Sequence, residues 1–293
     1  MKLLVTGANG QVGWELVRRG EAYGFSVDGF DRARLDITDE NSVSHALAAT
    51  LPDLVINAAA YTAVDKAESD ADAAFRVNCD GPAIVAAACA GANLPLIHLS
   101  TDYVFDGSAV RPYREDDPVA PLGVYGRSKE AGEVEVRRQL REHIILRTAW
   151  VYGVHGQNFV KTMVRLGRER EELAVVADQI GCPTCAADLA EAILVVAGKV
   201  LREGEKHWGT YHCCGKGEAS WYRFAREIFE LARAHQVNVK LKHLKPITTA
   251  DYPTPARRPI NSRLDCSRLQ QVFGIEMPDW RVGLSSMLNE FCF

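Results

Sequence analysis

The 293-residue sequence lacks any long apolar run. No stretch approaches the roughly 18 consecutive apolar residues that a membrane-spanning helix needs. The opening residues, MKLLVTGANG, turn polar after a short apolar run that is too brief for the core of a signal peptide. Internal repeats and low-complexity tracts are also missing. We therefore expect a cytoplasmic protein that does not associate with membranes.

A basic excess is missing as well. The chain has 34 Lys and Arg residues against 38 Asp and Glu residues, which gives a formal net charge of −4. Because nucleic-acid binding depends on cationic side chains that neutralise phosphates, this balance argues against a nucleic-acid partner. The apolar share of 47% and the charged share of 25% are those of an ordinary globular protein. Small molecules or other proteins are the expected partners.

The eight cysteines do not form the paired motifs of a structural zinc site. Cys182 and Cys185 have the spacing of one ligand pair, but Cys213 and Cys214 are adjacent and cannot supply the second. In a reducing compartment, cysteines among apolar neighbours serve as small core residues. We expect that role, and no metal, for the remaining thiols, which are those of Cys79, Cys89, Cys266 and Cys292.

The first half of the chain alternates between short apolar strands and helices. Parallel strands covered by helices on both faces produce this alternation. It predicts an α/β fold with a Rossmann-like, doubly wound parallel sheet. Asp39 or Asn41 is the expected N-cap of the second helix. Strands are predicted at 2–7, 26–31, 53–60 and 94–105, and helices at 11–24, 40–51 and 81–92.

The second half is less regular. A helix is predicted over 220–235, and the proline-rich stretch 243–264 is interpreted as an ordered loop. We expect residues 1–151 to form a dinucleotide-binding domain and residues 152–293 to form mainly a smaller, C-terminal substrate-binding domain.

A glycine motif lies between the first strand and the first helix. Gly7, Gly10 and Gly13 permit a tight turn and let the backbone approach a pyrophosphate, whose charge the helix N-terminus would stabilise. Asp31 ends the second strand, where a carboxylate binds the adenosine ribose. The G-x-x-G-x-x-G spacing resembles that of the short-chain dehydrogenase/reductases, and in particular their extended members.

Tyr125 and Lys129 lie four residues apart at the start of a predicted helix. Reducing a ketone leaves an alkoxide that must receive a proton, and a phenol can donate it. A lysine one helical turn away would lower the pKa of the phenol and could also reach the cofactor ribose. Ser100 and Thr101 end a strand and point to opposite faces, so only one of them can bind the substrate oxygen.

Six further blocks extend the resemblance over nearly the whole chain. They are NAAAYTAVDKAESD, STDYVFDG, YGRSKEAGE, RTAWVYG, DQIGCPT and YPTPARRPINSRL. Together they resemble the dTDP-4-dehydrorhamnose reductases, a family of extended short-chain reductases. The resemblance implies NAD(P)H-dependent reduction of the C4 ketone of dTDP-4-dehydro-β-L-rhamnose to dTDP-L-rhamnose, the last step of dTDP-rhamnose biosynthesis. It also selects Thr101 over Ser100 as the third catalytic residue, beside Tyr125 and Lys129.

The resemblance implies further site residues. Asp31 favours NADH because it repels a 2′-phosphate, whereas Arg32 and Arg34 favour NADPH, so use of both is expected. The implied cofactor-binding residues are Gly7, Gly10, Gln11, Val12, Gly13, Asp31, Asp36, Ile37, Ala60, Tyr61, Thr62 and Lys129. The implied substrate-binding residues are Thr101, Asp102, Tyr125, Trp150, Arg257 and Arg258.

The family also implies features beyond this site. Its chain crosses back, so residues 209–215 are expected to return to the first domain as a strand. Its members use magnesium between subunits, which would make a homodimer possible here. Glu15 and Glu290 match two of the acidic positions, but the third falls on Ala187 beside Asp188. No metal-binding residues are therefore predicted.

Two other classes of function stay open. Another nucleotide-sugar 4-ketoreductase, an epimerase or a 4,6-dehydratase could share the fold, although dehydratases follow their threonine with Asp-Glu and this chain has Asp102-Tyr103. The regulatory subunit of methionine adenosyltransferase resembles these reductases but is a non-catalytic binding partner. The presence of Thr101, Tyr125 and Lys129 favours catalysis.

Overall fold

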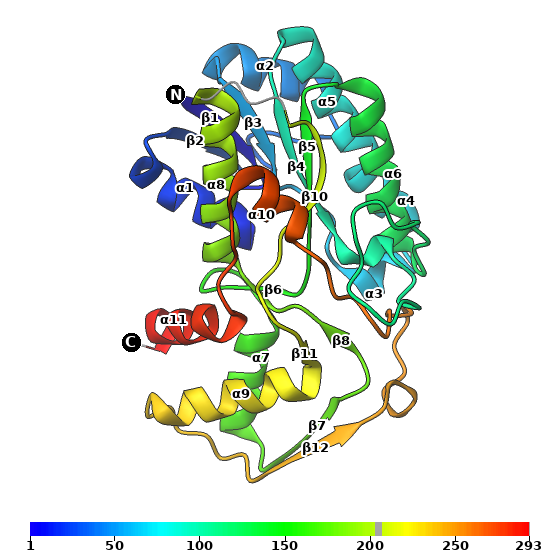
Figure 1. The fold of residues 1–293 in the computed structure, drawn as a ribbon, viewed down its shortest axis with the longest axis vertical. Coiled ribbons are helices and arrows are strands. Elements are labelled where there is room, and N and C mark those ends of the chain that lie inside the picture. The colour runs from blue at the N-terminus through cyan, green and yellow to red at the C-terminus, as the bar shows by residue number, and fades with distance from the viewer. Residues whose placement is uncertain (203–206, 293) are drawn as a thin grey trace.

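The computed structural model describes residues 1–202 and 207–292, with side chains up to Glu290. Two lobes are stacked along the long axis, the larger built on a central sheet (Figure 1). All six strands of this sheet run parallel, in the order β10-β5-β4-β3-β1-β2. They are β1 (Lys2–Thr6), β2 (Ser26–Phe30), β3 (Leu54–Asn57), β4 (Leu96–Thr101), β5 (His143–Thr148) and β10 (Gly209–His212). The predicted fold class is confirmed.

Helices bury both faces of the sheet. Side chains alternate along each strand, so Leu3 and Val5 pack towards α1 and α8, whereas Leu4 packs towards α2, α5 and α6. Because both faces are covered, the strands are apolar throughout. The helices of this lobe are α1 (Gln11–Arg19), α2 (Glu40–Thr50), α3 (Val64–Ala67), α4 (Ala71–Phe75), α5 (Gly81–Ala92), α6 (Val124–Gln139), α8 (Ala186–Arg202) and α10 (Ser267–Phe273), with the short turns η1 (Gly20–Tyr23), η2 (Arg76–Asp80) and η3 (Asp102–Val104).

Helix boundaries follow local chemistry. Asp39 caps α2, because its side chain accepts hydrogen bonds from the amides of Asn41 and Ser42; of the two expected N-caps, Asp39 is therefore the one observed. The predicted helix 11–24 ends as α1 at Arg19 and continues as η1. Gly24, with φ of 77°, then turns the chain towards β2.

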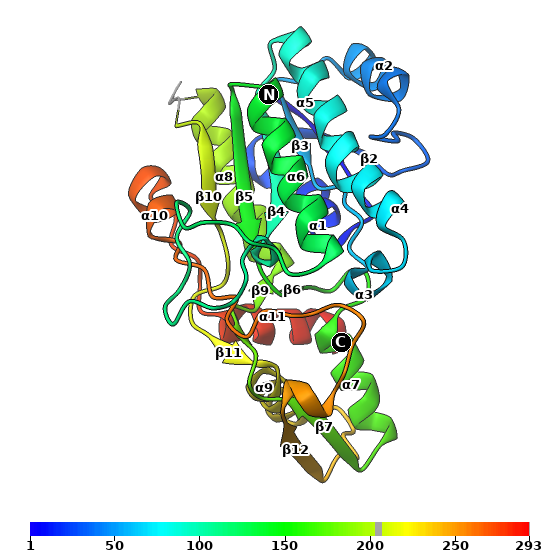
Figure 2. The ribbon, with the colours of Figure 1, turned by 90° about the vertical axis from the view of Figure 1, so that its right-hand side faces the viewer.

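The smaller lobe (Figure 2) has its own apolar core, which is centred on Phe224, Phe229 and Trp280. Short strand pairs surround this core, β6 with β9, β7 with β12, and β8 with β11. Its elements are β6 (Val151–Tyr152), α7 (Phe159–Glu169), β7 (Glu172–Val176), β8 (Ile180–Gly181), β9 (Thr184–Cys185), β11 (Ala219–Ser220), α9 (Trp221–Ala234), β12 (His243–Ile247), η4 (Thr249–Asp251) and α11 (Trp280–Cys292).

The second half of the chain crosses between the lobes more than once. β10 lies beside β5 in the central sheet, and α8 packs against α1. The start of the stretch interpreted as a loop is instead a strand, because residues 243–247 pair with β7 as β12. Pro246 is tolerated there since β12 is an edge strand of a two-stranded sheet. None of the helices in the described part of the chain combines the length and apolar character that crossing a membrane requires.

A buried carboxylate attaches α6 to the sheet. Glu133 accepts hydrogen bonds from Ser100 Oγ of β4 at 2.6 Å and from Arg147 Nε and Nη2 of β5 at 2.8 and 2.6 Å. Arg137 Nη1 donates a further bond at 3.0 Å. Burial opposes the ionisation of Glu133, but the hydrogen bonds and charge of Arg147, together with Ser100 and Arg137, outweigh it and hold the pKa of the carboxyl below its usual value. The network therefore fixes how α6 lies on β4 and β5.

We expect Glu133→Ala to lower the free energy of unfolding by about 3–5 kcal/mol, because it leaves the Arg147 guanidinium buried without its partner. Glu135→Ala is the matched control on the same helix. Glu135 pairs only with surface groups such as Arg138, so its loss should cost less than about 1 kcal/mol. Urea denaturation of both variants measures the difference. Equal losses would contradict the anchoring role of Glu133.

Candidate active site

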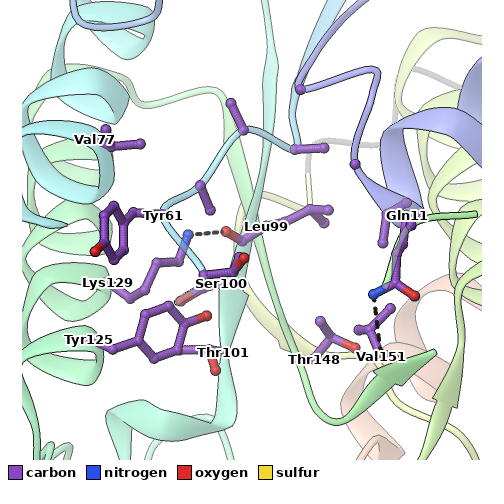
Figure 3. A pocket seen from close by; sticks show the side chains of 18 of the residues that line it. Gln11, Tyr61, Val77, Leu99, Ser100, Thr101, Tyr125, Lys129, Thr148 and Val151 are labelled. Atoms are coloured by element: carbon purple, nitrogen blue, oxygen red, sulfur yellow. Dashed lines mark hydrogen bonds between the residues drawn. The ribbon is translucent and has the colours of Figure 1, made fainter. Parts of the chain in front are cut away.

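A cavity of about 790 Å³ opens at the carboxyl ends of the central strands. Residues that follow β1, β3, β4 and β5 line it, and Trp221 of α9 contributes from the smaller lobe. Tyr125 and Lys129 project into it from α6, and Gln11 of α1 lies on the opposite side (Figure 3). Ligands of doubly wound sheets bind at this edge. The cavity is therefore the candidate active site.

The glycine turn forms one wall of the cavity. Gly7 has a φ of 70°, and a Cβ there would lie 2.6 Å from the backbone nitrogen of Ala59. A Cβ on Gly13 would lie 2.2 Å from the carbonyl oxygen of Gly7, so α1 approaches β1 closely only because this residue is glycine. Gly10 caps α1 without a side-chain hydrogen bond, and the first turn contains no acidic residue. Its amides can therefore face an anion.

Asp31 follows β2 at the edge of the same cavity. Its carboxylate accepts hydrogen bonds from Asn9 Nδ2 at 3.0 Å and from the amide of Arg34 at 3.1 Å. The Arg34 guanidinium lies over the Phe30 ring at 4.6 Å and donates to the carbonyl of Gly29. Asp31 and Arg32 line the cavity, whereas Arg34 lies outside its lining.

Asp36 and Ile37 continue this wall. The amide of Thr38 donates to Asp36, and this bond lowers the pKa of the carboxyl below its ordinary value. Arg32 is largely exposed and lies 3.5 Å from the Asp36 carboxylate. Ile37 is buried, with its apolar side chain beside Gly81 of α5. Ile37 therefore makes this part of the cavity wall apolar, while Asp36 and Arg32 place charges at its edge.

The loop after β3 places Ala60, Tyr61 and Thr62 on the cavity wall. Asn78 holds this loop, because its side chain accepts from the Tyr61 amide at 2.8 Å and donates to the Tyr61 carbonyl at 3.0 Å. The same side chain donates to Ser128 Oγ on α6 at 3.0 Å. Asn78 lies in the single π-helical turn η2 and is fully buried. The sequence carried no signal that this asparagine joins the two walls.

Thr101 and Tyr125 meet inside the cavity. The side chains of both residues line the cavity wall, and Thr101 Oγ1 donates to Asp102 Oδ1 at 2.9 Å. The hydroxyl of Ser100 is instead bound to Glu133. Lys129 is almost fully buried and donates from Nζ to the carbonyl oxygen of Leu99 at 2.6 Å (Figure 3). The three residues predicted to be catalytic therefore line one cavity.

The expected effect of Lys129 on Tyr125 is not observed. Burial raises the pKa of Tyr125 to about 12, with the Thr101 hydroxyl offsetting part of the rise and Asp102 adding to it. The ammonium points to the Leu99 carbonyl, and burial lowers the pKa of Lys129 to about 8. The prediction that Lys129 lowers the phenol pKa is wrong for this structure, because burial dominates both groups.

Asp102 is a buried carboxyl in the cavity wall. Burial raises its pKa to about 7, although hydrogen bonding with Thr101 and Ser262 offsets part of the rise. Its second oxygen, Oδ2, has no hydrogen-bond partner among the described residues. An unpaired buried acceptor is costly, so this oxygen can accept a hydrogen bond from a ligand hydroxyl.

Two indole rings form the wall nearest the smaller lobe. Trp150 and Trp221 stack with ring centroids 3.5 Å apart and planes at 5°. Trp150 has a φ of 46°, a left-handed conformation that is rare outside glycine and is found at functional sites. Gly181 makes room for it, because a Cβ there would lie 2.4 Å from Trp150 Cε2. Sequence reasoning missed Trp221, whose position opening α9 gave no sign of this contact.

The two arginines expected at the substrate diphosphate do not line the cavity. Arg258 donates from Nη2 to Asp65 Oδ2 at 2.8 Å, and this bond lowers the pKa of the Asp65 carboxyl below its ordinary value. Arg257 is exposed. The structure therefore engages Arg258 in an ion pair with Asp65 of α3 and leaves Arg257 at the surface.

The acidic residues implied for magnesium do not fit a metal site. Arg18 donates to Glu15 at 3.2 Å and also to both oxygens of Glu290, so a guanidinium occupies the space between the carboxylates. Ala187 offers no ligand. Asp188 beside it is half-buried, and burial raises its pKa to about 6. In the described part of the chain, no three His, Cys, Asp or Glu side chains are arranged to hold a metal ion.

Comparison with known proteins agrees with this geometry. A relative from Sinorhizobium fredii, named dTDP-4-dehydrorhamnose reductase, is 45% identical over 96% of this chain and 94% of its own length. A solved dTDP-4-dehydrorhamnose reductase from Clostridium acetobutylicum superposes with a TM-score of 0.92 at 41% identity over the full length of both chains. Another, from Bacillus anthracis in complex with NADP, has a TM-score of 0.90 at 38% identity over 99% of both chains.

The family profile described as RmlD substrate binding domain matches residues 1–293, the whole of the chain. The chain therefore belongs to this family, which is that of the dTDP-4-dehydrorhamnose reductases.

Proposed function

We propose that this protein reduces the C4 ketone of dTDP-4-dehydro-β-L-rhamnose to dTDP-L-rhamnose with NAD(P)H, the last step of dTDP-rhamnose biosynthesis. The observation that carries the proposal is the meeting of Thr101, Tyr125 and Lys129 in a cavity whose opposite wall is the glycine turn. When bound, the nicotinamide supplies a hydride to the carbonyl carbon. The protein must then stabilise and protonate the carbonyl oxygen.

Tyr125 is the proton donor in this proposal. With a pKa of about 12 its phenol stays protonated at neutral pH, which is the form that a reduction requires. Thr101 hydrogen-bonds the same oxygen and so orients the ketone as charge develops on it. Because both side chains line the same cavity, one carbonyl oxygen can be placed between their hydroxyls.

The remaining wall residues fit a dinucleotide. Gly7, Gly10, Gln11, Val12 and Gly13 would hold the pyrophosphate through the open amides of α1. Asp31 would bind the adenosine ribose, Asp36 and Ile37 the adenine, and Ala60, Tyr61 and Thr62 the nicotinamide side. Lys129 would reach the nicotinamide ribose. Asp31 suits NADH, whereas Arg32 and Arg34 suit NADPH, so we propose that both cofactors serve.

Both lobes contribute to the proposed substrate side of the site. The apolar face of the stacked Trp150 and Trp221 suits the C6 methyl of the sugar. The unpaired Oδ2 of Asp102 suits a sugar hydroxyl. Arg257 keeps its proposed role at the diphosphate, whereas Arg258 would first have to leave Asp65. We keep cofactor binding for residues 1–151 and mainly substrate binding for residues 152–293 as a proposal, although Thr101, Asp102, Tyr125 and Trp150 would reach the substrate from the first part.

We expect Tyr125→Phe to bind NADPH normally but to lose at least about 10²-fold in kcat, because the ring still packs while the transferable proton is gone. Steady-state kinetics with the dTDP keto-sugar and a cofactor titration measure the two effects. Tyr252→Phe is the control, since Tyr252 is exposed and lies outside the cavity wall. A Tyr125→Phe variant within a few fold of wild type would refute the proton-donor assignment.

We expect NADPH affinity to weaken as pH rises from 7 to 9, with a midpoint near pH 8. The sign follows from Lys129: burial depresses its pKa from 10.5 to about 8, so its ammonium is lost as pH rises through that value. Fluorescence titration of NADPH at several pH values measures the midpoint. In Lys129→Met, binding should be weak at every pH and this transition should vanish; a transition that persisted would assign it to another group.

We expect chelation of divalent cations to leave activity unchanged, because Arg18 already neutralises Glu15 and Glu290. The measurement compares kcat and molar mass in solution before and after EDTA. The reason for expecting a metal-bridged homodimer disappears with the metal. A loss of activity that added magnesium restores would contradict this reading of the Arg18 cluster.

A further inference from the structure

A second cavity of about 300 Å³ lies apart from the active site and shares none of its lining residues. Three cysteines face it. Cys182 lies between β8 and β9, Cys214 follows β10, and Cys266 precedes α10. Lys216 and Glu276 stand at its rim and form an exposed ion pair. The function proposed above uses none of these thiols.

Two of the three thiols are in contact. Cys214 Sγ lies 3.5 Å from Cys266 Sγ, and Cys182 lines the same cavity. Cys182 and Cys214 are buried, whereas Cys266 is half-buried and can be reached from solvent. Cys213, next in sequence, points away and contacts Met277 Sδ at 3.6 Å. The cluster therefore contains one accessible thiol and one buried neighbour within reach.

The position of this pair in the fold is distinctive. The chain leaves the central sheet after β10, builds β11, α9, β12 and η4 in the smaller lobe, and returns to α10, which packs on β10. Cys214 lies where the chain leaves the larger lobe, and Cys266 lies where the chain returns to it. Residues 215–265 form the excursion between them, so both ends of this excursion lie beside these two sulfur atoms. Trp221 and Ser262, both beside the substrate side of the active site, belong to that excursion.

We propose that Cys214 and Cys266 form a reversible disulfide that closes the neck of this excursion, with a peroxide as the oxidant. The Cys266 thiolate attacks one peroxide oxygen, which breaks the O–O bond, yields a sulfenic acid and releases hydroxide. Cys214 sulfur then attacks the sulfenic sulfur. Its proton and the departing hydroxide leave as water, so two thiols are oxidised by two electrons while the peroxide is reduced to water.

The geometry favours this pair. A disulfide has an S–S distance of about 2.05 Å, so the sulfurs must approach by roughly 1.5 Å, which rotation of side chains can provide. Hydrogen bonding with Cys182 and Cys266, together with burial, holds the pKa of the Cys214 thiol well above its usual value. Cys214 therefore keeps its proton until a sulfenic acid forms beside it, and Cys266 is the thiol that meets the oxidant.

The test is to treat the full-length protein with a small excess of hydrogen peroxide, alkylate the remaining thiols and digest with trypsin. We expect one new cross-linked species that joins peptides 207–216 and 264–268 and that disappears on treatment with a dithiol reductant. The oxidised protein should also unfold at a higher urea concentration than the reduced one, because the closed excursion restricts the unfolded chain. Neither readout depends on the proposed enzymatic activity.

Variants make the assignment specific. Cys266→Ser and Cys214→Ala should each abolish both the cross-link and the oxidation-dependent shift in urea. Cys79→Ser should keep both the cross-link and the shift in urea. Cys79 is half-buried like Cys266 but lies in η2, where it contacts no other thiol of the described residues. A cross-link through Cys182, Cys213 or Cys79, or no cross-link at all, would overturn the proposal.

Discussion

The buried carboxylate of Glu133 is the interaction on which the site depends. It joins β4, through Ser100, and β5, through Arg147, to one face of α6. Tyr125 and Lys129 precede it by eight and four residues, so all three lie along the same helical face. The network that anchors the helix therefore also directs the phenol and the ammonium into the cavity.

The same network gives the neighbouring hydroxyls of Ser100 and Thr101 different partners. Ser100 is bound to Glu133 and is not free to meet a ligand. Thr101, on the opposite face of β4, is left to contact Tyr125 and Asp102. Asn78 completes the arrangement, because it binds both the loop at Tyr61 and Ser128 of α6. Hydrogen bonds therefore hold the loop at Tyr61 to α6, and α6 to the sheet.

Burial governs the chemistry of the charged groups in this cavity. It raises the pKa of Tyr125 and Asp102 and lowers the pKa of Lys129. Each of these shifts favours the neutral form, as expected where water is excluded. For a reduction, a phenol that holds its proton at neutral pH is the useful state. In the proposed reaction, the lysine contributes through cofactor binding more than by acidifying the phenol.

Local patterns in the sequence were sufficient for the sheet and for much of the site. The glycine motif, the Asp39 cap and the spacing of Tyr125 and Lys129 each depend on a few adjacent residues. Asn78, Glu133 and Trp221 could not be found in this way, since their partners are distant in sequence. The pKa of Tyr125 and the Arg258–Asp65 pair were misjudged for a related reason. Burial and competing partners are set by the tertiary fold.

The proposed reaction transfers a hydride from the nicotinamide to a sugar C4 ketone bound in this cavity. The most direct measurement supplies wild-type protein with dTDP-4-dehydro-β-L-rhamnose and with NADPH carrying deuterium at the transferable position of the nicotinamide. We expect dTDP-L-rhamnose with one deuterium bonded to C4 of the sugar, detected by NMR and mass spectrometry. Deuterium that stayed on the cofactor, or that appeared at another carbon of the sugar, would contradict it.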